Sequence, residues 1–142
     1  MGRTKARPAP EKMHPEIDAQ LREQHVKALR QDESVGLYDS LCERLAVMGE
    51  INPATQKMVR DACAWEDVIV EAQSDIRKRG VMVELEQGSQ KIKCANKALS
   101  QLKTAQDQQR KIFTLLHLTP GARGRAAPDA APEEEADPFE QF

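Results

Sequence analysis

The chain has 142 residues, of which 39% are hydrophobic, 31% are charged and only 4% are aromatic. Deep ligand pockets are usually lined with apolar and aromatic side chains, so this composition argues against one, and it is typical of a small domain that completes its burial in an oligomer. The net charge of −2 is unevenly distributed, with +3 over residues 1–12 and −6 over residues 126–142. We therefore expect a flexible basic arm (1–12), a helical domain (13–120) and a disordered acidic tail (121–142).

Several classes of function find no support in the sequence. The three cysteines are widely spaced without a CxxC pair, which is typical of reduced thiols that fill small apolar spaces, and the three histidines lack the spacing of a zinc site. There is no phosphate-binding glycine loop, nucleophile elbow or HExxH motif. No apolar run is long enough for a signal peptide or a membrane span. We predict a soluble, intracellular protein that is not an enzyme, uses no metal or cofactor and has no membrane partner.

The first part of the chain carries a candidate basic surface. Three basic residues lie among prolines in the predicted arm and suit phosphate binding, although the arm could equally be an end that only aids solubility. These are Arg3, Lys5 and Arg7. Residues 15–31 have helical apolar spacing, with Pro15 in the first turn. Lys27 and Arg30 share a face of that helix, either as an extension of the basic surface or as an ordinary solvated face.

A short helix and a long helix follow, separated by a tight turn. Apolar residues from Leu37 to Met48 predict the short helix, which Gly49 should end. Asn52 and Pro53 are suited to the N-cap and the first position of the next helix. This order is compatible with a helix-turn-helix DNA reader and also with ordinary helix packing.

Two long helices, residues 53–79 and 96–118, are each expected to carry one narrow apolar seam. Apolar residues recur at alternating steps of four and three from Met58 to Ile76, and the same rhythm runs from Ala98 to Leu116. This pattern is typical of coiled coils and predicts an antiparallel helical hairpin. The predicted outer face of the first helix carries acidic residues and then a basic last turn that suits the helix dipole. The acidic residues are Asp61, Glu66, Asp67, Glu71 and Asp75.

Gln106 and Gln109 lie on or beside the seam of the second long helix. Polar seam residues often specify register or oligomer order, so both are candidates for oligomerisation, and an exposed position is the alternative. Asn96 is the expected N-cap of this helix.

Residues 81–94 change to a period of two and predict a β-hairpin. A turn at Gln87-Gly88 would pair Glu84 with Lys91 on one face. On the other face the same register pairs Val83 with Ile92 and Val81 with Cys94. An isolated hairpin is marginal in water, so it should either lie on a helix or extend a sheet with neighbouring subunits. The second alternative makes Val81, Val83 and Ile92 oligomerisation residues.

The last six residues depart from the Ala-, Pro- and Glu-rich segment before them, because they contain two of the chain's three phenylalanines. A short acidic and aromatic peptide is suited to docking in a partner's pocket, with Phe139 and Phe142 as anchors and Asp137 and Glu140 as flanking charges. A tail without a partner is the alternative.

The expected fold is therefore mainly α, a long antiparallel helical hairpin with a small β-hairpin at its tip and one or two shorter helices before it. The order of a helix ending at Gly80, a hairpin, a helix opening at Asn96-Lys97-Ala98 and the ending Leu118-Thr119-Pro120-Gly121-Ala122-Arg123 resembles the tailed-phage terminase small subunits. The resemblance covers roughly residues 37–125. Lys97 stands where that family usually has proline, and Gly121 where it usually has serine.

The resemblance implies a ring-forming protein of the host cell cytoplasm with two kinds of partner. Such proteins bind double-stranded viral DNA for genome packaging and recruit or regulate the large terminase, which supplies the ATPase and nuclease activities. On this reading the helical hairpin builds the ring, and the acidic tail is the candidate contact for the large subunit. The DNA contacts would be Arg3, Lys5 and Arg7, with Lys27, Arg30 and Lys57 as weaker candidates. The competing interpretation is a cytosolic coiled-coil adaptor or assembly chaperone that does not bind nucleic acid.

Overall fold

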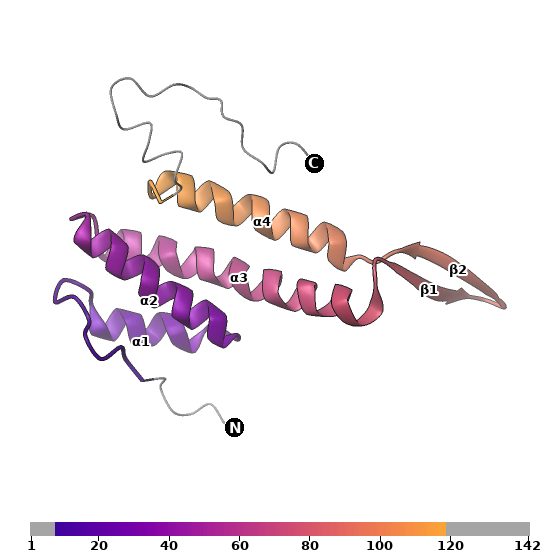
Figure 1. Cartoon of the computed structure of the whole chain (residues 1–142), viewed down its shortest axis with the longest axis horizontal. Helices are drawn as coiled ribbons and strands as arrows, with labels where there is room; N and C mark the ends of the chain where they lie inside the picture. Colours follow the sequence, from indigo (N-terminus) through magenta and orange to yellow (C-terminus); the bar gives the residue numbers. More distant parts are fainter. Residues whose placement is uncertain (1–7, 119–142) are drawn as a thin grey trace, which may run out of the picture.

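A computed structural model describes residues 8–118, which form four helices and one two-stranded antiparallel sheet. In chain order the elements are α1 (Ala19–Lys27), α2 (Asp32–Val47), α3 (Pro53–Arg79), β1 (Met82–Gln87), β2 (Gln90–Ala95) and α4 (Ala98–Leu115). The long helices α3 and α4 lie side by side and antiparallel, α1 and α2 pack against α3, and the hairpin projects beyond one end of the helical body (Figure 1). The mainly helical fold with a β tip is confirmed.

Local sequence signals determine both ends of α3, as predicted. Asn52 and Thr55 form a reciprocal capping box, in which each side chain accepts the other residue's backbone N–H at 2.9 Å. Pro53 occupies the first turn, where its missing N–H removes no helical hydrogen bond. The helix ends at Gly80, whose φ of +87° strongly favours glycine.

The two shorter helices differ from their predicted bounds. The first was expected over 15–31, but α1 begins only after Asp18, whose side chain accepts the Leu21 N–H at 3.0 Å. The second, predicted from Leu37, begins at Asp32, directly after two residues whose backbone N–H groups are bonded by another helix, as shown below. Its end agrees with the prediction. Gly49 follows α2, and its N–H donates to Ala46 in a Schellman arrangement.

The core lies where α1, α2, the first half of α3 and the end of α4 meet. Its largest fully buried apolar side chains are Tyr38, Leu45, Val26 and Val59. The buried thiols of Cys42 and Cys63 also lie here, and burial raises the pKa of Cys42 to about 12. Cys42 therefore stays a protonated thiol at neutral pH, which agrees with the predicted role of an apolar filler.

Another side of α3 packs against α4. The predicted seams face one another there, and small buried residues, Ala62 and Ala72 on α3 with Ala98 and Ala105 on α4, allow the two helices to approach closely. The molecule is thus thick at one end and only two helices wide near the hairpin (Figure 1).

The hairpin forms where predicted, but the predicted register is wrong by two residues. Glu84 pairs with Lys93 instead of Lys91, and Val83 pairs with Cys94 instead of Ile92. The turn falls one residue later than predicted, at Gly88-Ser89, because Gly88 takes a φ of +61° at the first turn position. A shift of two residues keeps every side chain on its predicted face, so the amphipathic character of the hairpin survives the correction.

Asn96 joins the hairpin to both long helices. Its side-chain oxygen accepts the Ala98 N–H at 2.9 Å, which caps α4 as predicted, and its amide donates to the Gly80 carbonyl at 2.9 Å and to Asp75 at 3.0 Å. Its backbone N–H donates to the Val81 carbonyl at 2.8 Å. We call this junction of Asp75, Gly80, Val81, Asn96 and Ala98 the neck. The helix that follows ends at Leu115, three residues before the predicted end at Leu118.

Candidate functional site

The basic candidates within residues 8–118 have different environments. Lys27, in the last turn of α1, and Lys57, in the first turns of α3, are both exposed. Arg30 is also partly exposed, but its guanidinium makes a bidentate pair with Glu71, with two N···O distances of 2.8 Å. This pair raises the pKa of Arg30 and lowers that of Glu71. The charge of Arg30 is therefore already compensated within the chain.

Arg30 is part of a structural junction built around Asp67. The Asp67 carboxylate accepts the backbone N–H of Arg30 at 2.9 Å, that of Gln31 at 3.0 Å, and the Ser34 hydroxyl at 2.6 Å. These donors belong to the start of α2, whose own N-cap residue makes no side-chain cap. Because Arg30 and Gln31 immediately precede Asp32, Asp67 anchors the segment that leads into α2 to the neighbouring α3. The sequence placed Asp67 on the solvated outer face, and this was wrong because the side chain is 1% exposed.

The surroundings of Arg30 are also acidic. A shallow groove beside the start of α2 is lined by Glu33, Glu66 and Glu71, with Arg77 as its basic residue. A phosphate approaching Arg30 would meet these carboxylates, which disfavours an anion on this side of the molecule.

Lys57 lies on a side of α3 that faces His25 of α1. His25 is buried and its Nδ1 lies 2.8 Å from the Tyr38 hydroxyl, which also accepts a hydrogen bond from Gln56 at 3.0 Å. Burial lowers the pKa of His25, and the nearby charges of Arg60 and Lys57 lower it further. Arg60 is paired with Asp61, which opposes its effect on the pKa of His25, so Lys57 is the exposed basic residue on this side of α3.

A buried ion pair between α1 and α2 also binds Pro8, the first described residue. The guanidinium of Arg22 is 3% exposed and bonds both carboxylate oxygens of Asp39, at 2.8 and 2.9 Å. The same guanidinium donates to the Pro8 carbonyl at 3.0 Å. This bond holds Pro8 beside α1. Arg3, Lys5 and Arg7 lie outside the described residues.

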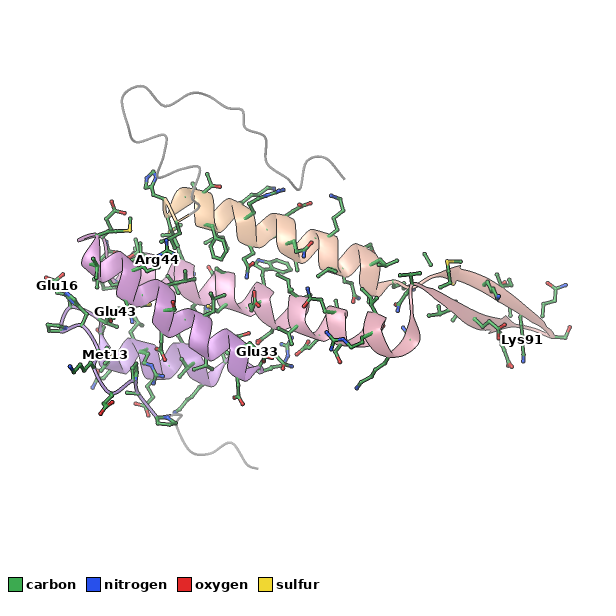
Figure 2. The ribbon with its side chains drawn as sticks, viewed as in Figure 1. Met13, Glu16, Glu33, Glu43, Arg44 and Lys91 are labelled. Atoms are coloured by element: carbon green, nitrogen blue, oxygen red, sulfur yellow. The ribbon has the colours of Figure 1, made fainter. Side chains whose placement is uncertain are left out.

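The second candidate surface is the hairpin. Val81, Leu85 and Ile92 are 54%, 46% and 39% exposed, and Val83 is half-buried. Figure 2 shows Lys91 on the hairpin, at the opposite end of the molecule from Glu16. The hairpin does not lie on a helix, so the first of the two expected arrangements is not adopted.

Gln106 and Gln109, the two glutamines near the α4 seam, are both half-buried. The amide of Gln109 donates to the Ala62 carbonyl at 3.1 Å and to the Glu66 carboxylate at 2.8 Å. These bonds tie α4 to α3 within one chain. Within residues 8–118, the side chain of Gln106 makes no hydrogen bond to α3. The tail residues Asp137, Phe139, Glu140 and Phe142 lie outside the described residues.

Residues 8–118 contain no group of three or more side chains placed to hold a metal ion. Over the same span, no helix is long and apolar enough to cross a membrane.

Comparison with known proteins identifies the family. Residues 36–133 match the family described as phage terminase, small subunit, which is more than half of the chain. The chain belongs to this family. It therefore has a role in phage DNA packaging. No curated protein and no solved structure matches it. The family match confirms the resemblance inferred from sequence, and it begins inside α2, so that α1 and the predicted arm precede the matched segment of this small terminase.

Proposed function

We propose that this small terminase assembles into a ring, binds double-stranded viral DNA, and recruits or regulates the large terminase without catalysing a reaction itself. Family membership carries the proposal. Two features of the structure support its parts, namely the uncovered apolar side chains of the hairpin and the exposed lysines on α1 and α3.

Ring assembly is supported by the hairpin, since Leu85 and Ile92 form a directly opposed apolar pair that solvent reaches. Burying such pairs between subunits would stabilise an oligomer. Native mass spectrometry should show a single closed oligomer larger than a dimer, and a monomer or dimer would overturn the ring. Leu85→Asp with Ile92→Asp should dissociate it. Leu115→Asp is the matched control, because Leu115 is 68% exposed at the far end of α4.

DNA binding is assigned to the predicted arm and to Lys27 and Lys57. Each phosphate contact that is removed should reduce the slope of log K against log salt by about 0.9. We expect Lys57→Ala to weaken duplex binding and flatten this slope. Arg30→Ala should leave the slope nearly unchanged, because its charge is engaged by Glu71. Deletion of residues 1–7 tests the arm and keeps the Pro8 carbonyl that Arg22 binds. A full-length oligomer without salt-sensitive duplex binding would instead favour an adaptor or assembly chaperone.

The acidic tail is assigned to the large terminase. Aromatic side chains are frequent anchors in interfaces, and Phe139 and Phe142 supply two in a short acidic segment. The double variant Phe139→Ala, Phe142→Ala should lose binding to the large subunit and retain both ring mass and duplex binding. Asp137→Asn with Glu140→Gln measures the contribution of the flanking charges. Unchanged affinity of the phenylalanine variant for the large subunit would exclude this role of the tail.

A further inference from the structure

The two strands of the hairpin carry opposite charges. On one face of the sheet, β1 carries Glu84 and Glu86, and β2 carries Lys91 and Lys93. All four side chains are exposed. Within the hairpin they form two opposed pairs, Glu84 with Lys93 and Glu86 with Lys91. One edge of this small sheet is therefore acidic and the other is basic.

Both edges are free to pair with another strand, since the sheet of residues 8–118 contains only β1 and β2. Three edge-to-edge pairings with a second copy are conceivable, and the charges distinguish them. Two β1 strands would place Glu84 and Glu86 against the same residues of the other copy, and two β2 strands would place lysines against lysines. Like charges in opposed strands are unfavourable. Only β1 against β2 of the next copy brings opposite charges together.

This pairing also has the geometry that a ring requires. Around a rotation axis all hairpins point the same way, so β1 of one subunit runs antiparallel to β2 of the next, as the two strands do within a hairpin. Pairing of two identical edges belongs instead to a two-fold dimer. A continuous sheet would also bring together the apolar faces formed by Val83, Leu85, Ile92 and Cys94, which now contact solvent.

We infer that the acidic edge of β1 and the basic edge of β2 direct head-to-tail assembly, with β1 of each subunit paired with β2 of the next copy. This inference rests on the proposed ring and specifies which residues select its contacts. Glu84, Glu86, Lys91 and Lys93 then act as specificity determinants, because they favour one pairing and oppose the two that would stop assembly at a dimer.

A complete charge exchange tests the inference without disturbing the hairpin itself. The variant Glu84→Lys, Glu86→Lys, Lys91→Glu, Lys93→Glu keeps an opposite-charge pair at both positions within each hairpin. It should form the same oligomer as the wild type when alone. At every boundary with a wild-type subunit, however, it opposes like charges. Any mixed ring has at least two such boundaries.

The measurement is native mass spectrometry of nitrogen-15 wild type and unlabelled variant, unfolded and refolded together. Cross-strand pair energies make each mismatched boundary about fivefold less favourable, so mixed rings should be depleted by about 25-fold relative to random mixing. Two controls should mix randomly with the labelled wild type, namely unlabelled wild type and Lys12→Glu, Glu16→Lys. The second exchanges two exposed charges, and Glu16 lies at the end of the molecule opposite the hairpin (Figure 2).

The outcomes separate the inference from the proposed function. Rings that sort by charge support the inference. If wild type and charge-exchanged variant mix as randomly as the controls do, the inference is wrong and the proposed ring still stands. The edge charges would then serve only to keep the strands from aggregating. If the wild type forms no ring, both the proposed function and the inference fail.

Discussion

Replacing Asp67 should disconnect α2 from α3, because its carboxylate satisfies two backbone donors and one hydroxyl at the start of α2. Each buried donor left without an acceptor costs about 1–3 kcal/mol, less where water can enter. We expect Asp67→Ala to lower the free energy of unfolding by about 3 kcal/mol. For a chain of this length the corresponding fall in Tm is roughly 6–12 °C.

Urea denaturation followed by helical circular dichroism measures this loss, at several protein concentrations so that assembly is accounted for. Asp67→Asn retains one acceptor oxygen and should lose about half as much. Amide exchange should accelerate selectively at Arg30 and Gln31, whose N–H groups lose their acceptor. Asp61→Ala is the matched control, since Asp61 lies on the same helix, is more exposed than Asp67 and bonds its half-buried neighbour Arg60 at 2.9 Å. If Asp67→Ala behaves like Asp61→Ala, the bonds of Asp67 to the segment before α2 do not stabilise the fold.

Three further outcomes follow from the same structure. Arg22→Ala should destabilise the chain by about 3 kcal/mol in urea denaturation, because it leaves the Asp39 carboxylate without its buried partner, and a change below 1 kcal/mol would contradict this. Burial lowers the pKa of His25 in the folded chain. As the pH falls, His25 therefore binds a proton in the unfolded chain before it does so in the folded chain. The free energy of unfolding should be highest above about pH 6.5 and decline below it. His25→Gln should flatten the pH dependence of urea denaturation between pH 7.5 and 5.5, and an unchanged slope would exclude His25 as its source. His117 has a φ of +59° after α4, so His117→Gly should raise the Tm and His117→Val should lower it, whereas the reverse order would refute strain there.

The sequence predicted the elements whose signals are local. The N-cap at Asn52, the glycine at 80 and the three–four rhythm of the seams depend on residues within one or two turns of each other. The hairpin was predicted in its place but with a shifted register. Its alternation of side chains is identical for shifts of two residues, and only the positive φ of Gly88 selects the observed turn.

Features that depend on contacts between distant residues could not be predicted. The start of α2 depends on Asp67, 33 residues after Ser34 in sequence. In the sequence Asp67 is one more acidic residue on an amphipathic helix, and no local signal distinguishes it from Asp61. The same holds for the pairing of Arg30 with Glu71, 41 residues away, which turns a candidate phosphate contact into a structural residue.

The candidate site was predicted only in part for the same reason. Exposure of Lys27 and Lys57 agrees with their assignment to a basic surface, while the roles of the arm and the tail lie outside residues 8–118 and stay predictions. The sequence shows that β1 is acidic and β2 is basic. The inference about assembly also requires that neither strand pairs with a third one, and the structure of residues 8–118 shows this.

The neck has a consequence for how this protein can be altered. Asn96 closes the chain across the base of the hairpin, since it bonds the Gly80 and Val81 carbonyls on one side and caps α4 on the other. The hairpin between Val81 and Asn96 can therefore be replaced as a unit, because the buried Asn96 holds its two ends together. A graft that keeps Gly80 and Asn96 could carry a hairpin of another length or charge while the long helices retain their alignment.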